Sequence, residues 1–378
     1  MLWVVRDLQQ PKWWESALRG SAVLNFPDWR EKYKFASRLL YMRYLTGLED
    51  GSTLIQIGES DTEKGVRLMT GKREEAARRR VFANIEALGL NECVSELDNQ
   101  GFTVLKSALT PDQVERAKAA VLRRVAAETG RVVDPDLSSA EDFRGMQYQH
   151  YLIFEDPVFP EILLQEQTLA LMHYLLGESC VLSSMGSHFR GPGGLPLALH
   201  ADGSSVGMTE ASLVANCNYA LTPYSAENGA LLLMPGSHRK NRYPTVGENW
   251  MSGEDTIFDV IAENRPAEEL DNMTWTPPEG AVTMDIDVGD AVIWHGNTWH
   301  GGWRRDALGT RINLAAYFCR SHISTQERRG DDRFPEVFER YADDPRFAQL
   351  MGERVFNGWR EEGPDFSSAK RNPLGIFD

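Results

Sequence analysis

Histidine and aspartate residues with the spacing of metal ligands lie in the middle of the chain. His200 and Asp202 are two residues apart, and in an extended strand such residues project from the same face, so that both can bind one ion. A second segment, GDAVIWHGNTWHGGWRRDALGTRINLAAYF, carries His295 and His300 at the end of an apolar run. Either histidine would complete a set of metal ligands made of two nitrogens and one oxygen. The His-X-Asp pair alone would equally fit a hydrogen-bonded surface pair, so the predicted metal site depends on both segments.

Two histidines and one carboxylate are typical of a non-haem Fe(II) oxygenase, because three ligands on one face leave positions for a co-substrate and dioxygen. A structural zinc site instead needs four protein ligands that complete the coordination shell, and these usually include thiolates. The cysteines form no Cys-X-X-Cys pair; they are Cys93, Cys180, Cys217 and Cys319. Arg311 follows on the next predicted strand, and its planar guanidinium matches the distal carboxylate of 2-oxoglutarate.

These segments resemble the phytanoyl-CoA dioxygenase family of Fe(II)- and 2-oxoglutarate-dependent oxygenases over roughly residues 95–322. The similarity is carried by GFTVLKSALTPDQVERAKAAV, HYLLGES, LALHADGS, NGALLLMPGSHR and GDAVIWHGNTWHGGWRRD with the RINL that follows. The family's separation of eleven residues between distal histidine and arginine favours His300 over His295. The resemblance implies a double-stranded β-helix whose metal ligands and 2-oxoglutarate anchor are His200, Asp202, His300 and Arg311.

Further contacts to the co-substrate and substrate are predicted around this set. Asn218 lies eighteen residues after His200, where family members often contact 2-oxoglutarate, and Asn216 shares its strand face. An amide at either position can donate to a carboxylate. The candidate substrate-binding residues, each of which could instead be structural, are His188, Arg190, Trp250, Trp275 and Trp303.

The elements that must position these residues change along the chain. A helical extension is predicted for residues 1–94, and the oxygenase domain for residues 95–322. Within that domain, residues 180–318 contain short β-rich runs divided by Gly and Pro, as in an antiparallel sandwich or barrel. Residues 323–378 predict a helical tail packed on the core. The expected fold is mainly β with α decoration: a jelly-roll, cupin-like core flanked by helices. The long insertion 239–280 suggests a lid over the metal mouth, since long connections are often functional.

Composition and net charge indicate which classes of molecule the protein is expected to bind. The 378 residues are 42% hydrophobic and 25% charged, which is typical of a globular protein. Asp plus Glu outnumber Lys plus Arg by 55 to 40, and the resulting charge of -15 disfavours nucleic acid and anionic lipid. No apolar run reaches the ~18 residues of a membrane span, and no signal peptide is evident. We therefore expect a cytoplasmic protein that acts on a small molecule.

The sequence thus predicts a dioxygenase that uses Fe(II), 2-oxoglutarate and O2. It would oxidise, and most simply hydroxylate, a C–H bond of a small, fairly apolar metabolite, with release of succinate and CO2. One alternative is a metal-dependent oxygenase that does not use 2-oxoglutarate, for which Arg311 would have no evident role. The other is a non-catalytic β-helix binding protein, which would not need a complete ligand set.

Overall fold

The computed structural model describes residues 77–139, 142, 146–327, 339–341, 343–352, 358–360 and 363–365. Most of the predicted N-terminal extension therefore lies outside the described residues. In the tail, the structure contains α12 (Pro345–Leu350) and also a two-stranded sheet of β13 (Gly358–Arg360) and β14 (Gly363–Asp365), which the helical prediction for this segment did not include. Among the described residues, no helix is both long and apolar enough to span a membrane.

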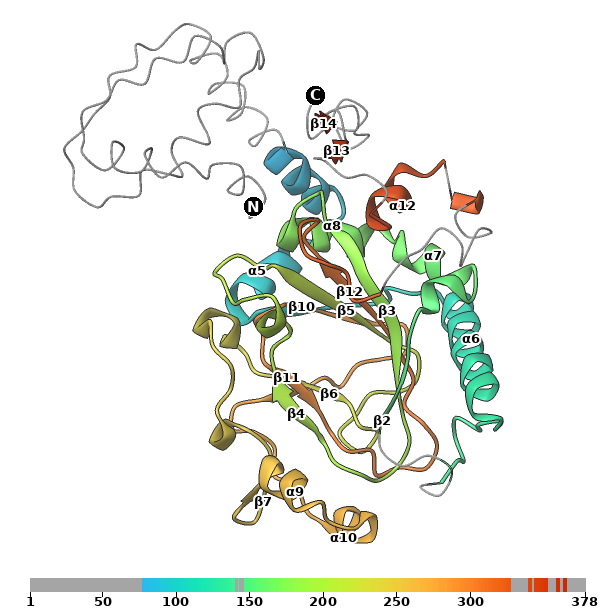
Figure 1. Ribbon diagram of the computed structural model, residues 1–378, viewed down its shortest axis with the longest axis vertical. Helices are drawn as coiled ribbons and strands as arrows, with labels where there is room; N and C mark the ends of the chain where they lie inside the picture. Colours follow the sequence, from blue (N-terminus) through green and yellow to red (C-terminus); the bar gives the residue numbers. More distant parts are fainter. Residues whose placement is uncertain are drawn as a thin grey trace, which may run out of the picture. The chain divides into compact units, whose positions relative to one another are not determined.

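Two antiparallel sheets face each other and form the core (Figure 1). The six-stranded sheet has the order β1 (Phe102–Leu105), β10 (Ala291–His295), β5 (Val214–Ala220), β12 (Asn313–Cys319), β3 (Val181–Arg190), β2 (Met146–Gln149). The four-stranded sheet has the order β4 (Leu197–His200), β11 (His300–Gly302), β6 (Leu231–Leu233), β9 (Val282–Thr283). From β3 to β6, and again from β9 to β12, each strand lies in the opposite sheet to the strand before it, so the predicted jelly roll is confirmed.

Side-chain alternation along the strands separates the interior of the sandwich from its outer face. On β5, Cys217 and Tyr219 belong to the core under the helices, whereas Asn216 and Asn218 face the other sheet. On β6, Leu231 and Leu233 belong to the apolar cluster between the sheets. The interior is thus apolar towards β1 and β6 and polar near the centre of β5 and β12.

Four helices cover the outer face of the larger sheet: α5 (Asn91–Gln100), α6 (Pro111–Thr129), α7 (Val158–Leu163) and α8 (Glu166–Leu176). The predicted start of α6 is confirmed, because Thr110 and Gln113 form a capping box and Pro111 occupies the first turn. Residues spaced three or four apart on α6 are buried in the core: Val114, Ala117, Val121 and Val125.

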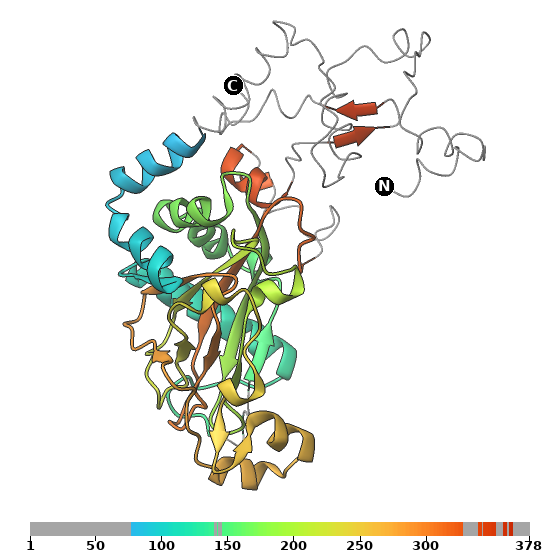
Figure 2. The same ribbon diagram turned by 90° about the vertical axis from the view of Figure 1, so that its left-hand side faces the viewer.

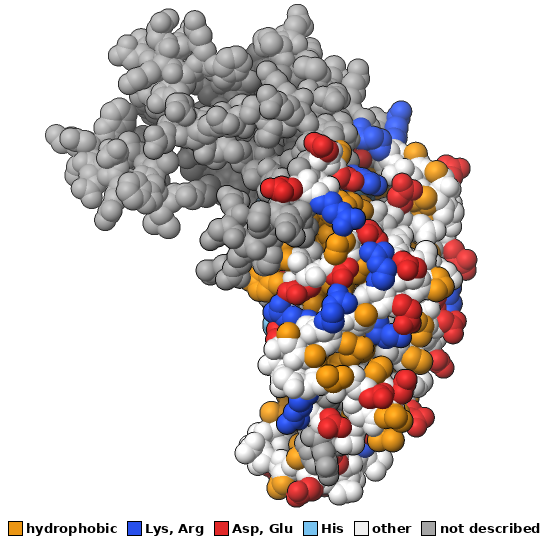
Figure 3. Space-filling model, turned by 90° about the vertical axis from the view of Figure 1, so that its right-hand side faces the viewer, with side chains coloured by type: hydrophobic (Ala, Val, Ile, Leu, Met, Phe, Trp, Pro, Cys, Tyr) orange, Lys and Arg blue, Asp and Glu red, His pale blue; other side chains and the backbone are white. Residues whose placement is uncertain are grey.

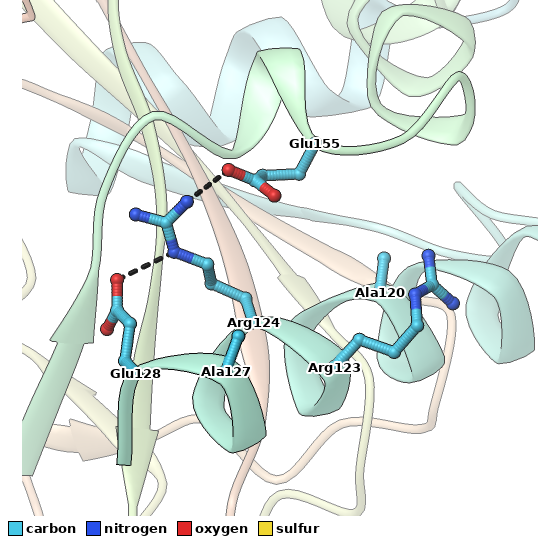
Figure 4. A pocket seen from close by; sticks show the side chains of 6 residues that line it. All are labelled: Ala120, Arg123, Arg124, Ala127, Glu128 and Glu155. Carbon is cyan, nitrogen blue, oxygen red and sulfur yellow. Dashed lines mark hydrogen bonds and ion pairs between the residues drawn. The ribbon is translucent and has the colours of Figure 1, made fainter. Parts of the chain in front are cut away.

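The exposed side of α6 carries ion pairs. Acidic and basic side chains are interspersed over this side of the molecule (Figure 3). A shallow hollow beside α6 is bridged by Arg124, whose guanidinium donates to both Glu128 and Glu155 (Figure 4). Arg123, which also lines the hollow, donates to Asp156 over 2.7 Å, so both arginines are already paired with carboxylates.

The insertion 239–280 packs against the outer face of the four-stranded sheet. It contains β7 (Met251–Ser252), β8 (Asp255–Thr256), α9 (Ile257–Glu263) and α10 (Ala267–Asn272), and the gold helices lie at one end of the sandwich (Figures 1 and 2). An apolar cluster joins the insertion to the sheet; it includes Trp250, Ile257, Val260, Trp275, Leu199, Leu232 and Trp299. This buried cluster does not support the predicted mobile lid, because opening the segment would expose it to water.

Candidate functional site

The structure brings the three predicted metal ligands together between the two sheets. His200 ends β4, Asp202 begins the 3-10 turn η2 (Asp202–Ser205), and His300 begins β11. Antiparallel pairing sets His300 directly opposite His200, with ring centroids 4.2 Å apart. One ligand atom from each of the three residues lies within 4.8 Å of the others. This arrangement is suited to a single ion bound by three protein ligands.

Backbone carbonyls orient both histidine rings. The Nδ1 atom of His200 lies 2.9 Å from the carbonyl oxygen of Ala198, and Nδ1 of His300 lies 3.1 Å from that of Thr298. A proton on each Nδ1 leaves Nε2 as the lone-pair donor, which is the tautomer that a metal ligand needs. Burial lowers the pKa of His300 to about 4, so this ring is neutral at pH 7.

Asp202 is oriented by a tryptophan. The indole N–H of Trp294, on β10, donates to Oδ2 of Asp202 over 3.2 Å, while Oδ1 lies 3.7 Å from Nε2 of His300. The turn after Asp202 packs closely, because a Cβ on Gly203 would lie 2.3 Å from Oδ1 of Asn297. Only glycine therefore fits this turn without displacing its neighbour. The sequence places Trp294 near the site, but nothing in the sequence distinguishes it from Trp299 and Trp303.

His295 lies apart from this cluster. Its Nδ1 accepts a hydrogen bond from the backbone N–H of Asn297 over 3.1 Å, and its ring packs 5.5 Å from that of His238. Burial lowers the pKa of His295 to about 4. Its contacts are those of a packed structural residue.

Arg311 is buried between the sheets, with 5% of its surface exposed. Its guanidinium donates from Nη1 to the Gly229 carbonyl and from Nη2 to the His188 carbonyl, the latter over 3.2 Å, and lies 5.4 Å from the ring centre of Tyr224. Its Nε is buried without a hydrogen-bond partner. In the part of the chain that the structure describes, no carboxylate pairs with Arg311. A buried cation without an anion suits an anionic ligand.

The two asparagines of β5 differ in what they offer. Oδ1 of Asn218 already accepts from the Tyr224 hydroxyl over 3.1 Å and from Nδ2 of Asn313 over 3.0 Å. Oδ1 of Asn216 is buried without a partner, and Asn216 lines the cavity beside Asp202. Asn216 therefore presents the unused acceptor, although the sequence pattern pointed first to Asn218.

A cavity of about 530 Å³ reaches the metal site. Ten of its eleven lining residues carry a polar side chain and only Ala315 does not; the ten are Tyr148, His150, Tyr151, Ser184, His188, Asp202, Asn216, Tyr317, Gln326 and Glu327. Tyr148 packs its ring 4.6 Å from that of His188. Burial raises the pKa of Tyr148, so its phenol stays neutral and can donate a hydrogen bond.

Sequence reasoning missed most of these lining residues. Ser184 and His188 are an even number of residues apart on β3, so their side chains lie on the same face of the strand, and the same holds for Tyr317 and Arg311. The alternation of side chains along a strand could therefore have identified both Ser184 and Tyr317 from the sequence. Tyr148 and Glu327 come from segments without a clear strand pattern. Glu327 accepts from the backbone N–H of Tyr151 over 2.6 Å and of Met185 over 3.2 Å, a long-range contact that no local spacing indicates.

The three tryptophans among the predicted substrate residues do not reach the cavity. Trp250 is fully buried, donates to the Leu197 carbonyl over 2.9 Å and packs against Trp303 with ring centres 4.9 Å apart. Trp303 donates to Thr283 over 2.8 Å, and Trp275 belongs to the same cluster. These side chains lie on the outer face of the four-stranded sheet, so they serve packing. Of the other two candidates, His188 lines the cavity and Arg190 does not.

Comparisons with known proteins show which proteins this chain is similar to. The model of the family described as phytanoyl-CoA dioxygenase matches residues 97–311. A dioxygenase of Aspergillus fumigatus, af480, is 25% identical over 246 residues, which cover 62% of this chain and 69% of that protein. A probable alpha-ketoglutarate-dependent hypophosphite dioxygenase of Stutzerimonas stutzeri is 23% identical over 280 residues, 69% of this chain and 94% of that protein.

Among solved structures, HygX from Streptomyces hygroscopicus, with nickel and 2-oxoglutarate bound, aligns with a TM-score of 0.47 and 18% identity. The alignment covers 65% of this chain and 93% of HygX.

Proposed function

Since this chain belongs to the phytanoyl-CoA dioxygenase family, we propose that His200, Asp202 and His300 hold the Fe(II) of a 2-oxoglutarate-dependent dioxygenase and that Arg311 binds the distal carboxylate of its 2-oxoglutarate. The reaction class follows from the family and from the dioxygenase relatives. The assignment of residues rests on one observation: three ligand atoms within 4.8 Å of one another, with both imidazoles turned so that Nε2 is available.

The donor set fits the expected ion and co-substrate. Two neutral nitrogens and one carboxylate suit Fe(II), and they leave coordination positions for a bidentate co-substrate and dioxygen. When bound, iron with 2-oxoglutarate and dioxygen supplies the oxidising power to attack a C–H bond, while 2-oxoglutarate is converted to succinate and CO2. An oxygenase that does not use 2-oxoglutarate would leave the buried, carboxylate-free Arg311 without a role.

The protein's own groups bind and orient the reactants. The carbonyls of Ala198 and Thr298 hold the imidazoles in one tautomer, and Trp294 fixes the rotation of the Asp202 carboxylate. Arg311 would place the co-substrate by charge-assisted hydrogen bonds. His300 is buried and His200 and Asp202 are half-buried, which strengthens these contacts because the local dielectric is lower than that of water.

The cavity favours a small substrate with hydrogen-bonding groups. Its volume of about 530 Å³ is in the range of small-molecule sites. A fairly apolar metabolite, as expected from the sequence, would leave the buried Oδ1 of Asn216 without a hydrogen-bond partner, which costs binding free energy. We therefore propose that the substrate carries a hydroxyl, amide or amine group that donates to this oxygen.

The metal assignment is tested by Asp202→Ala with His295→Ala as the matched control. Anaerobic titration with Fe(II) should show one site per wild-type chain, strongly weakened binding in Asp202→Ala, and wild-type binding in His295→Ala. Succinate formation from 2-oxoglutarate should disappear only in the first variant. Iron binding of wild-type strength in Asp202→Ala would refute the assignment.

A further inference from the structure

Arg190 places a second buried guanidinium beside Arg311. The backbone N–H of Arg190 donates to the Arg311 carbonyl over 2.9 Å, and the Arg311 N–H donates to the Arg190 carbonyl over 2.8 Å. In such a hydrogen-bonded antiparallel pair the two side chains project from the same face, with Cα atoms about 5.5 Å apart. The exposed fractions are 1% for Arg190 and 5% for Arg311. Two positive charges therefore share one side of the sandwich interior.

Neither guanidinium has an anionic partner within the described ranges. Nη2 of Arg190 donates to the Leu195 carbonyl, and its Nε is buried without a partner, as is Nε of Arg311. Like charges directly opposite each other on a sheet are destabilising, and burial of unpaired charge adds to that cost. Burial, and then the charges of Arg311 and Arg304, lower the pKa of Arg190 to about 9, although the charge of Asp306 acts in the opposite direction. An anion between the two side chains would remove this repulsion.

Arg305 shows how a purely structural arginine is bonded at this end of the sandwich. Its guanidinium donates from Nε to the Gly309 carbonyl over 3.0 Å, from Nη1 to Oδ1 of Asn228 over 3.0 Å, and from Nη2 to the Leu308 carbonyl. All three nitrogens are therefore used to hold loops. Arg190 has a single such bond, so loop support does not account for its guanidinium.

We propose that Arg190 and Arg311 together form a two-guanidinium site for the distal carboxylate of 2-oxoglutarate, in which Arg190 supplies the second charge and makes the protein selective for 2-oxo dicarboxylates. The inference rests on the proposed role of Arg311. A 2-oxo acid without a distal carboxylate would leave both charges buried and unpaired, so it would bind poorly.

The test compares two co-substrates in anaerobic calorimetric titrations of the Fe(II)-loaded protein. 2-Oxopentanoate has the 2-oxo acid head and chain length of 2-oxoglutarate but ends in a methyl group. Arg190→Met should weaken 2-oxoglutarate binding at least tenfold and change 2-oxopentanoate binding less than twofold. Unchanged affinity for 2-oxoglutarate, or equal losses for both acids, would overturn the proposal, because mere support of the loop at Leu195 would affect both alike.

Two further variants complete the experiment. Arg190→Lys keeps the positive charge but lacks the planar guanidinium, so it should retain part of the preference for 2-oxoglutarate over 2-oxopentanoate. This variant replaces Arg190→Met in the test if the methionine variant does not fold. Arg265→Met is the matched control: its guanidinium pairs with Asp255 and Glu263, away from Arg190, so the ratio of the two affinities should not change.

The wild-type protein and Arg311→Leu separate this inference from the proposed function. If wild-type protein does not bind 2-oxoglutarate, or Arg311→Leu binds it normally, the proposed function fails. If Arg311→Leu loses affinity and Arg190→Met does not, only the role of Arg190 fails.

Discussion

At the scale of single residues, the site depends on side chains that orient the ligands as well as on the ligands themselves. Trp294 donates its only polar hydrogen to the Asp202 carboxylate, and Arg311 keeps a buried charge without a carboxylate partner among the described residues. Both contacts lie between the sheets, where the low dielectric makes each of them strong. Their removal should therefore change metal and co-substrate binding more than it changes the fold.

Trp294→Phe tests the orientation of the carboxylate. Loss of the indole N–H leaves the carboxylate free to rotate, and removal of such an outer contact typically costs 10–100-fold in metal affinity. We expect Fe(II) binding weakened by about tenfold or more, measured by anaerobic titration. Trp299→Phe is the control, because its N–H donates to the Arg242 carbonyl on the outer cluster. Equal losses in both variants would point to a general effect on stability.

Arg311→Leu tests co-substrate binding. A desolvated, charge-assisted pair contributes on the order of 2–5 kcal/mol, so the concentration of 2-oxoglutarate needed for half-maximal succinate formation should rise at least tenfold. Arg311→Lys should rescue only part of this loss, since an ammonium group cannot form the planar fork. An unchanged requirement would mean that another group binds the carboxylate.

At the scale of elements, the insertion 239–280 acts as a packed layer of the fold. Its tryptophans, Trp250 and Trp275, share an apolar cluster with Leu199 and Leu232 of the small sheet, on the face opposite the one that presents His200. The insertion can therefore influence the metal site by stabilising β4, which carries the first ligand. It does not contribute a side chain to the cavity.

Trp250→Ala tests this role. Removal of a fully buried tryptophan should lower the free energy of unfolding by about 3–5 kcal/mol, measured by urea denaturation. The affinity for 2-oxoglutarate should stay within about twofold of the wild-type value at a temperature where the variant is folded. Phe258→Ala, at a position 40% exposed on the same insertion, should change stability by about 0.5 kcal/mol or less. A stable Trp250→Ala with altered substrate affinity would instead favour the lid.

At the scale of the whole molecule, buried neutral histidines make the fold sensitive to acid. Burial lowers the pKa of His173 and of His295 to about 4, against about 6.5 in an unfolded chain. Below about pH 6.5 the unfolded state therefore binds more protons than the folded state. Stability contributed by these neutral rings is complete above pH 7 and is lost as the pH falls towards 4.

The melting temperature of the metal-free protein should therefore be flat above about pH 7 and fall steadily between about pH 6.5 and 4.5. Each such histidine contributes a slope of about 1.4 kcal/mol per pH unit in that window. His173→Gln cannot take up a proton, so its stability profile should be less steep, whatever its stability at pH 7. A profile as steep as that of the wild type would show that His173 does not carry this dependence.

The sequence by itself indicated the jelly roll and, through its resemblance to the family, the proposed ligands His200, Asp202 and His300 and the proposed anchor Arg311. The spacing within each half of the site is short: Asp202 is two positions after His200 on one extended segment, and Arg311 is eleven positions after His300. Local backbone geometry places His200 and Asp202 on one face, whereas the separation of eleven is informative by comparison with the family.

Only the tertiary structure decided what surrounds those residues. Tyr148 and Glu327 reach the cavity from segments separated by nearly half the chain, and Arg190 faces Arg311 only because β3 pairs alongside β12. Aromatic residues of the insertion could equally have covered the metal or the outer face of the small sheet. Sheet register and the burial of apolar surface place them on the outer face. Both depend on long-range contacts that local spacing in the sequence does not encode.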